Sequence, residues 1–434
     1  MPARRTFPRS SLWIVMMSLL LLAGCSGLSN GQAPNDLNGV KVVLPSPTSA
    51  ATNGGTSGAA LRQQLIRQTV EHMLSGMTLD EKLGQLFLIE STHKTYTQDV
   101  DNMVVGMHAG AMIVYQQNIT DWQQLHDMLA TIQAHAAIPM LVTMDEEGGG
   151  VDRLGNNNLA PPLPSAQNMA ATGNPQFAYN EGVAAAKEML ALGINTNLAP
   201  VVDVRTTPAA IEWDRLFGNS PATVDRYAGE FLKGLQDNGV IGCLKHWPGI
   251  GSITLDPHKT LPTMDRTMSQ LNSTEFAAFK GLLGDDPGMI MVTHVIVPAI
   301  DPTLPATLSP KVVQGTLRDK LGYQGVVMTD SLYMQGIAIN YKLPQAAVLS
   351  IEAGDDLLEG AYDTYSMRAM IQAIKNAMKA GKITQDRIDQ SVRRILALKV
   401  RFGMIPLYEP HVIRGDALRG ATSPLAEADL PRGA

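Results

Sequence analysis

The segment 244–258 concentrates side chains that could do chemistry. Lys245 and His246 end an apolar run, and Asp256 and His258 follow a stretch rich in glycine and proline. The apolar run predicts a buried strand, so Lys245 and His246 should lie where this strand gives way to a loop. Loops held by a rigid scaffold commonly carry binding and catalytic residues. We therefore interpret this segment as part of an active site.

Asp256 and His258 are separated by one residue, a spacing that suits general acid and base catalysis. A carboxylate can orient an imidazole and raise its basicity, and histidine titrates close to neutral pH. An alternative is a metal site built from His246, His258 and His294. Neither HExxH-type spacing nor a cysteine cluster supports that alternative.

Three other polar positions each allow a functional and a structural interpretation. The stretch 145–153 sets acids beside three glycines, so it could bind hydroxyl groups of a ligand or form a solvated turn. Asp330 directly follows an apolar run and could act as a carboxylate nucleophile or as a helix N-cap. Arg215 could bind a substrate oxygen or form a surface salt bridge.

Apolar runs and helical patterns alternate along most of the chain. The runs predict strands at 86–89, 111–114, 140–144, 197–204, 240–244, 289–292, 326–328 and 356–358. The helical patterns predict helices at 61–74, 121–136, 177–192, 223–238, 272–283, 310–321, 344–353, 365–380 and 385–402, and a capping box at 78–81 predicts another short helix. Eight strands alternating with helices predict an α/β fold with a single (β/α)8 TIM-type barrel. The alternative, an open doubly wound sheet, lacks the glycine-rich dinucleotide turn.

Polar residues that could be reactive follow the predicted strands directly or close their polar ends. They are Asp145, Asp203, Lys245, His246, His294 and Asp330. Active sites of such barrels are built at the carboxyl ends of the strands, so one barrel mouth should collect all of these side chains.

The two ends of the chain differ in composition from the predicted barrel at 61–403. Residues 1–24 have the order of a bacterial lipoprotein signal peptide, ending at Leu-Ala-Gly before Cys25, which would carry the lipid. An uncleaved anchor helix is the alternative, although the apolar run is short for a membrane span. Residues 25–60 predict a disordered tether, and residues 404–434 predict a C-terminal tail that covers the surface or is disordered. We expect an exported lipoprotein, anchored on the outer face of the bacterial cytoplasmic membrane.

The charge of the chain disfavours a nucleic-acid-binding protein, and its cysteine content disfavours a disulfide-stabilised one. Removing the signal peptide with its three arginines changes the formal net charge from −6 to −9, which disfavours nucleic acid as a partner. The chain has 2 cysteines, and if Cys25 carries lipid, Cys243 has no intrachain disulfide partner. Cys243 lies in a predicted strand and is expected to be an inert buried thiol.

Several of these stretches together resemble the β-N-acetylhexosaminidases of glycoside hydrolase family 3. The family signature Lys-His-Phe-Pro-Gly-His-Gly, followed by Asp-Ser-His, is similar to residues 245–251 and 256–258. Further similarities lie, in order, at 145–153, 197–203, 215–218, 305–309, 329–332 and 389–396. The resemblance covers about residues 61 to 403.

The resemblance implies roles for individual residues. Asp330 would be the nucleophile and His258 the general acid/base, with Asp256 holding the imidazole. An N-acetylglucosamine unit would be bound by Asp145, Arg153, Arg215, Lys245 and His246. The implied activity is retaining hydrolysis of terminal β-linked N-acetylglucosamine in oligosaccharides or cell-wall fragments, which requires no metal or nucleotide cofactor. No protein partner is predicted.

Three residues depart from the family pattern and leave other functions open. Gly150 stands where the family usually has arginine, Ile250 replaces a histidine, and Pro257 replaces the serine between the two dyad residues. A β-glucosidase, a phosphorylase that transfers the sugar to phosphate, or a non-catalytic sugar-binding lipoprotein are the alternatives.

Overall fold

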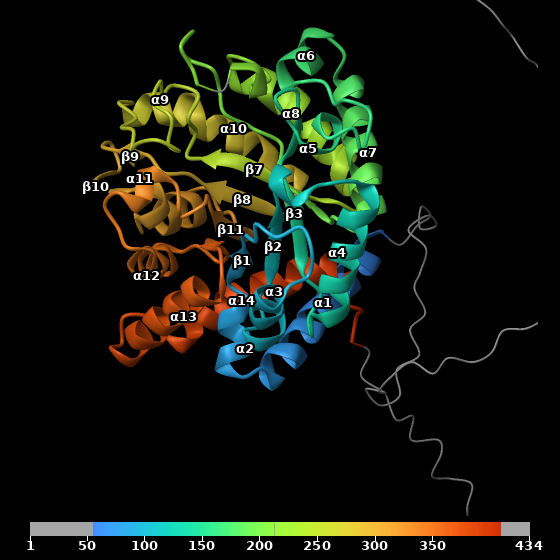
Figure 1. The fold of residues 1–434 in the computed structure, drawn as a ribbon. Helices are drawn as coiled ribbons and strands as arrows, with labels where there is room; N and C mark the ends of the chain where they lie inside the picture. The colour runs from blue at the N-terminus through green and yellow to red at the C-terminus, as the bar shows by residue number, and fades with distance from the viewer. Residues whose placement is uncertain (1–54, 212, 409–434) are drawn as a thin grey trace, which may run out of the picture. The chain divides into compact units, whose positions relative to one another are not determined.

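The computed structural model describes residues 55–211 and 213–408, and its centre is a sheet of eight parallel strands (Figure 1). The strands are β1 (Phe87–Ile89), β2 (Ala111–Val114), β3 (Leu141–Met144), β6 (Thr196–Asn197), β7 (Ile241–Trp247), β8 (Met289–Val292), β11 (Val326–Thr329) and β12 (Leu358–Ala361). They follow the order β11-β8-β7-β6-β3-β2-β1-β12. A parallel bridge between Met328 and Leu357 joins the two ends of the sheet. The predicted eight-stranded parallel barrel is therefore confirmed.

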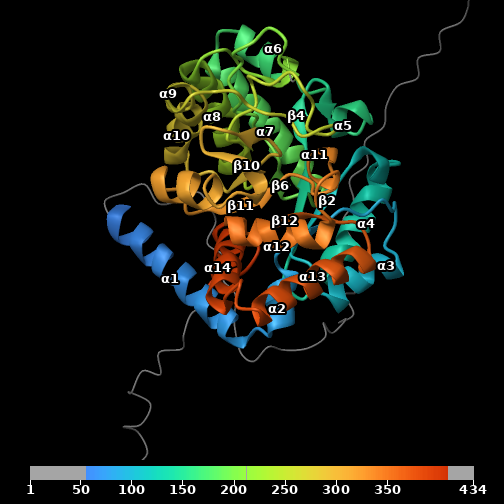
Figure 2. The ribbon, with the colours of Figure 1, turned by 90° about the vertical axis from the view of Figure 1, so that its left-hand side faces the viewer.

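Helices surround this sheet (Figures 1 and 2). The α-helices are α1 (Gly55–Gly76), α2 (Leu79–Gly84), α3 (Gln98–Asp101), α4 (Trp122–His135), α5 (Arg153–Asn156), α6 (Ala166–Ala171), α7 (Pro175–Leu192), α8 (Pro221–Asp237), α9 (Met268–Ser273), α10 (Glu275–Leu282), α11 (Gln335–Ala338), α12 (Leu343–Ala353), α13 (Thr364–Lys379) and α14 (Gln385–Arg401). Two small antiparallel hairpins, β4 (Glu146–Gly148) with β5 (Val151–Asp152) and β9 (Ile296–Val297) with β10 (Asp301–Pro305), lie outside the barrel sheet.

Successive residues of the barrel strands are buried on opposite sides of the sheet. On β2, Met112 and Val114 belong to the large apolar cluster shared with the surrounding helices. Ala111 and Ile113 belong to a separate, smaller cluster that also contains Cys243. Strands buried on both faces explain the continuous apolar runs in the sequence. Cys243 is a buried free cysteine and burial raises the pKa of its thiol, as expected for an inert side chain.

The last helix packs against the smaller apolar cluster. Ile395 and Leu398 of α14 are members of that cluster, and Phe402 packs against it. Helix α1 lies beside α14 (Figure 2). The final helix therefore contributes to the apolar cluster that also holds Cys243.

The observed elements differ from the predicted ones at several boundaries. Helix α1 begins at Gly55 rather than at 61. The strand predicted at 197–204 is reduced to Thr196–Asn197 and a single bridge at Val201. Pro200 lies between these two parts and has no N–H to donate to a strand ladder.

Two predicted helices also have a different form. The segment predicted as 272–283 is divided into α9 and α10 at Thr274, whose φ of −127° and ψ of −79° are not helical. The segment predicted as 310–321 forms a π-helix over Val313–Lys320. The capping box before α2 is present, with Thr78 and Glu81 bonded to each other's backbone N–H, which confirms that prediction.

The termini of the described region pack on the barrel domain. Ile405 is buried, and the Tyr408 ring stacks on His72 of α1 with 4.2 Å between ring centroids. The predicted signal peptide, Cys25, residues 25–54 of the tether and residues 409–434 of the tail lie outside the described residues. Within the described ranges, helices long and apolar enough to cross a membrane are absent.

Candidate active site

A cavity of about 380 Å³ lies at the carboxyl ends of the barrel strands. Residues named from the sequence that line it are Asp145, Arg153, Arg215, Lys245, His246, His258 and Asp330. Asp256 does not line the cavity, but it contacts His258. The fold thus brings side chains from five separate stretches of the sequence to one mouth, where barrel active sites are found.

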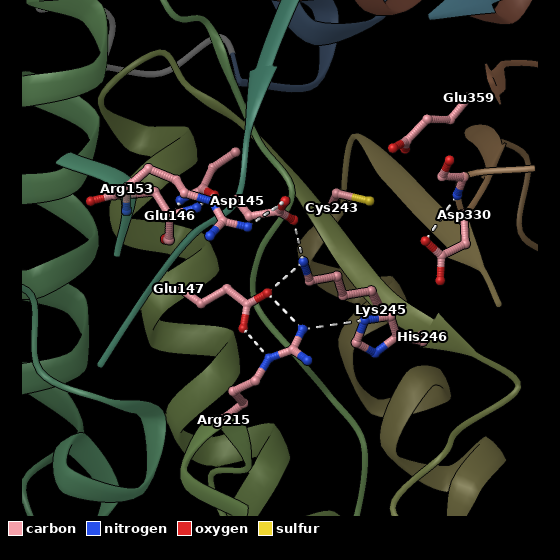
Figure 3. Close-up of polar contacts among 12 residues, drawn as sticks. Asp145, Glu146, Glu147, Arg153, Arg215, Cys243, Lys245, His246, Asp330 and Glu359 are labelled. Atoms are coloured by element: carbon pink, nitrogen blue, oxygen red, sulfur yellow. Dashed lines mark hydrogen bonds and ion pairs between the residues drawn. The ribbon is translucent and has the colours of Figure 1, made fainter. Parts of the chain in front are cut away.

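The centre of the site is a chain of ion pairs around Lys245 (Figure 3). Lys245 Nζ lies 2.7 Å from Asp145 Oδ1 and 2.5 Å from Glu147 Oε1. Arg215 and Glu147 form a bidentate ion pair, in which Nε donates to Oε2 at 2.6 Å and Nη2 donates to Oε1 at 2.8 Å. Arg153 lies 3.5 Å from the second Asp145 oxygen. The alternatives of a solvated turn and a surface salt bridge are wrong, because Glu147 is buried and pairs with Arg215 inside the cavity.

The charges in this chain sustain one another. Burial alone would lower the pKa of Lys245, but the Asp145 and Glu147 carboxylates raise it above its ordinary value. Burial would likewise raise the pKa of Glu147, whereas Arg215 and Lys245 hold it well below its usual range. Lys245 and Glu147 therefore stay charged at neutral pH, and the site offers fixed donors and acceptors to a polar ligand.

Glycines make the β4–β5 hairpin that carries Glu147 possible. Gly148 has a φ of +89°, and a Cβ there would lie 2.1 Å from the Pro164 carbonyl oxygen. Gly149 also has a positive φ, of +61°. Only glycine adopts this backbone without strain. Gly150, where the family usually has arginine, lies in the turn between the two strands.

His246 is oriented by Asp203. The imidazole Nδ1 lies 2.7 Å from Asp203 Oδ2, and the other carboxylate oxygen accepts the Ile250 N–H at 2.7 Å. Nδ1 donates to this carboxylate, and the other ring nitrogen, Nε2, lies 3.5 Å from Arg215 Nη2. The departure at Ile250 therefore leaves the backbone bond that fixes Asp203 intact.

Asp330 follows β11 directly and lines the cavity. Thr293 Oγ1 donates to Asp330 Oδ2 at 3.1 Å, and the Ser331 N–H donates to Oδ1 at 3.0 Å. Burial would raise the pKa of Asp330, but the nearby His294, His246 and His258 rings and the Ser331 N–H lower it. The N-cap alternative is wrong, because α11 has Met334 as its N-cap. The carboxylate is thus anionic and lines the cavity.

The dyad forms as predicted, with Pro257 between its members. His258 Nδ1 lies 2.8 Å from Asp256 Oδ1, which also accepts the His258 N–H at 2.9 Å. The imidazole side chain is 67% exposed. Partial burial of Asp256 would raise its pKa, but the His258 N–H and imidazole lower it. A charged carboxylate on Nδ1 leaves Nε2 available for proton transfer.

Among the cavity-lining residues that were not named from the sequence, three form one polar cluster. They are Glu90, Tyr115 and Glu359. Glu90 and Tyr115 directly follow β1 and β2, and Glu359 lies in β12. Each of the three directly follows a strand predicted from the sequence, so the rule that polar residues at strand ends gather at one mouth would have found all of them.

Glu90 and Glu359 share the hydroxyl of Tyr115. Tyr115 Oη lies 2.7 Å from Glu359 Oε1 and 3.0 Å from Glu90 Oε2, and its single proton serves one carboxyl at a time. Glu90 also accepts from Ser331 Oγ at 2.9 Å. Burial, together with the charge of Asp330, raises the pKa of Glu90 to about 7 despite these hydrogen bonds, and burial and Glu90 raise that of Glu359 well above normal. The pair therefore retains a proton near neutral pH.

Glu146, next to the ion-pair chain, gives a stability prediction. Burial, followed by a hydrogen bond and repulsion from Asp152, raises the pKa of Glu146 to about 9. Glu146 Oε2 accepts the N–H groups of Arg153 at 2.7 Å and Leu154 at 3.2 Å. A glutamine can accept the same two N–H groups through its amide oxygen. Its amide nitrogen can also donate to Asp152, which the Glu146 carboxyl can do only after it has bound a proton. Glu146→Gln should thus raise the free energy of unfolding at pH 7.5 by about 2 kcal/mol.

The pH dependence distinguishes this cause from better packing. A carboxyl whose pKa rises on folding costs nothing below its unfolded pKa, and its cost grows as pH rises towards the folded value. The gain should accordingly vanish near pH 4 and be complete near pH 9, as measured by urea unfolding at several pH values. A gain of the same size at every pH would refute the titration argument. Glu352→Gln, the same substitution on α12 and away from the β4–β5 hairpin, serves as the control.

The histidines of the metal alternative have other partners. His246 binds Asp203, and His258 binds Asp256. His294 is buried, with Nδ1 2.7 Å from Thr307 Oγ1 and Nε2 2.9 Å from the Ser331 carbonyl oxygen. Within 55–211 and 213–408, groups of three or more His, Cys, Asp or Glu arranged to hold a metal ion are absent.

Comparisons with known proteins agree on one family. The family model described as "Glycosyl hydrolase family 3 N terminal domain" matches residues 78–398. The chain is 30% identical to beta-hexosaminidase LpqI of Mycobacterium tuberculosis over 91% of its own length and 97% of that protein. It is 28% identical to beta-hexosaminidase A of Pseudoalteromonas piscicida over 71% of its length, but spans 56% of that protein.

A solved structure gives the same result. The glycoside hydrolase family 3 beta-N-acetylglucosaminidase of Paenibacillus sp. str. FPU-7 matches with a TM-score of 0.73 and 34% identity, over 78% of this chain and 65% of that one. The family model covers most of the chain, and the barrel and the sequence similarity agree with it. The chain belongs to glycosyl hydrolase family 3.

Proposed function

We propose that the protein is a retaining exo-glycosidase that releases terminal β-linked N-acetylglucosamine from oligosaccharides or cell-wall fragments. The observation that carries this proposal is one cavity lined by both the Asp330 carboxylate and the His258 imidazole that Asp256 orients. The printed names of the relatives, hexosaminidases and an N-acetylglucosaminidase, support the choice of sugar.

The first chemical step uses the two sides of the dyad and the nucleophile. Asp330 attacks the anomeric carbon and forms a glycosyl ester, while His258 Nε2 gives its proton to the leaving oxygen. Asp256 accepts from Nδ1 and stabilises the positively charged imidazolium before transfer. The bond between the anomeric carbon and the leaving oxygen breaks as the ester bond forms.

The second step reverses the role of the imidazole. Neutral His258 takes a proton from water through Nε2, and the resulting oxygen attacks the anomeric carbon. Asp330 leaves as a carboxylate, and the product keeps the β configuration. The lowered pKa of Asp330 suits both attack and departure.

The ion-pair chain binds the sugar in this proposal. Asp145 accepts sugar hydroxyl protons, Lys245, Arg153 and Arg215 donate to sugar oxygens, and the His246 ring contacts the sugar. Their fixed pairing holds the donors in place before substrate arrives, which lowers the entropic cost of binding. The pocket thereby sets the anomeric carbon against Asp330.

An activity screen tests this function against its alternatives. Aryl β-glycosides of N-acetylglucosamine and glucose should be assayed with and without phosphate. We expect turnover of the N-acetylglucosaminide at a rate independent of phosphate. Faster turnover of the glucoside would favour a β-glucosidase, and a phosphate-dependent rate with a sugar phosphate product would favour a phosphorylase. Calorimetric binding of N-acetylglucosamine without any turnover would favour a non-catalytic sugar-binding protein.

We also propose that the protein is exported and lipid-anchored through Cys25 on the outer face of the cytoplasmic membrane. The order of basic, apolar and small residues before Cys25 supports this location. With Cys25→Ala, the mature protein should be lost from the membrane fraction, because the chain is either soluble or keeps its signal peptide uncleaved. The substitution should also abolish labelling by a fatty-acid analogue. Unchanged labelling would refute lipidation at this position.

A further inference from the structure

In the loop that carries Asp256 and His258, Pro257 is buried, but the two side chains that follow it extend into solvent. The side chains of His258 and Lys259 are 67% and 82% exposed. The dyad bond fixes the imidazole relative to its own loop only. A general acid must nevertheless keep its proton within hydrogen-bond reach of the leaving oxygen. The loop therefore needs an anchor on the body of the protein.

The backbone provides this anchor at the start of α11, five residues after the nucleophile. The Gly336 N–H donates to the Pro257 carbonyl oxygen at 3.0 Å, and the Gln335 N–H donates to the His258 carbonyl oxygen at 3.3 Å. Amide groups in the first turn of a helix have no partner within the helix, so the dyad loop supplies their acceptors. These two bonds tie the acid/base loop to the segment that carries Asp330.

Gly336 permits this close approach because it has no side chain. A Cβ at this position would lie 3.0 Å from the Pro257 carbonyl oxygen, 3.2 Å from that of Thr260 and 3.0 Å from His294 Cβ. His294 is fully buried and both of its ring nitrogens are bonded, so it resists movement. The exposed dyad loop is then the neighbour that gives way.

We propose that Gly336 is a positioning residue that holds the His258 loop against the nucleophile segment. The inference rests on the proposed function, because it requires His258 to act as acid and base. A side chain at 336 moves the loop outward and withdraws the imidazole from the leaving oxygen. Asp330 stays in place because Thr293 Oγ1 and the Ser331 N–H bind it, and Lys245 stays in place because Asp145 and Glu147 pair with it.

Leaving-group dependence provides a test that a purely structural effect would not mimic. A leaving group that is a stable anion, such as 2,4-dinitrophenolate, departs without protonation, whereas a sugar leaving group requires it. For Gly336→Val we expect kcat/KM to fall about 10- to 100-fold on an N-acetylglucosamine disaccharide, yet less than about 3-fold on the dinitrophenyl glycoside. Breakdown of the glycosyl ester still needs a general base, so kcat on the dinitrophenyl substrate should fall in this variant. Sodium azide should restore that kcat, because azide attacks the ester without a general base.

Matched variants make the outcome decisive. Gly336→Ala should give a smaller effect of the same kind, and it decides the question if the valine variant does not fold. Gly284→Val is the control, since a Cβ there meets nothing within 4 Å and its backbone φ is not positive. His258→Ala sets the full extent of lost acid/base catalysis. If His258→Ala itself shows no leaving-group dependence, the proposed function of His258 fails.

Two results would overturn the inference while leaving the proposed function intact. One is that Gly336→Val loses activity equally on both substrates and azide does not restore it. The other is that both Gly336 variants retain wild-type kcat/KM on the disaccharide. In either case His258→Ala would still show a strong leaving-group dependence.

Discussion

Replacing Asp330 with asparagine is expected to lower kcat on an aryl N-acetyl-β-glucosaminide by at least about 10⁴-fold, because the neutral amide is a far weaker nucleophile. The amide oxygen can still accept the Ser331 N–H, so the site should keep its shape. KM should change little by comparison. The thermal midpoint should fall modestly, since the folded protein lowers the pKa of Asp330 and therefore favours its charged form.

The control for Asp330→Asn is the same change at a surface carboxylate. Asp319 accepts a hydrogen bond from Gln314 on the π-helix, at an exposed position. Asp319→Asn should retain wild-type kcat. Initial-rate kinetics of the two variants and the wild type decide the matter, and a rate for Asp330→Asn within tenfold of wild type would rule out Asp330 as the nucleophile.

Lys245→Met should cause the largest loss of stability, about 3–5 kcal/mol in the free energy of unfolding. Methionine keeps an apolar stem of similar length but removes the charge, so Asp145 loses its closest cation and Glu147 keeps only Arg215. An unpaired buried carboxylate is much more costly than an exposed one. Turnover should fall as well, because Lys245 is a proposed sugar-binding donor.

A surface lysine is the control, because it shows the effect of removing a lysine charge at an exposed position. Lys233 lies on α8, is 55% exposed and pairs with Asp237 one helical turn away. Lys233→Met should change stability by less than about 0.5 kcal/mol. Urea unfolding of both variants tests the prediction. Equal stability of Lys245→Met and the wild type would mean that the ion-pair chain contributes nothing to the fold.

The barrel could be predicted from the sequence because parallel strands buried on both faces leave a strong pattern. Six of the eight predicted strands overlap strands of the barrel over most of their length, and each is a continuous apolar run. The placement of Asp145, Lys245 and Asp330 at one mouth then follows from chain direction alone, since all eight strands are parallel. There are two exceptions. The run predicted at 356–358 meets β12 only at Leu358, and the strand predicted at 197–204 is shortened where Pro200 has no N–H to donate.

The pairing of side chains within the mouth could not be predicted from the sequence. Glu147 binds Arg215 across 68 positions of the chain, and the distance between them depends on the β4–β5 hairpin. Glu90 and Glu359 are separated by most of the barrel in sequence, and they meet at Tyr115 because β12 pairs with β1. The anchor of the dyad loop at Gly336 is made by backbone groups, which have no sequence signature.

The central claim is that the sugar becomes covalently attached to Asp330. A fluorinated N-acetylglucosaminide with a reactive leaving group slows the second step more than the first, so the intermediate accumulates. Intact-protein mass spectrometry should then show a mass increase of one fluorosugar, and peptide mapping should place it on Asp330, with no label on Asp330→Asn. Labelling at another residue, or product formation with inverted configuration and no covalent species, would contradict the account.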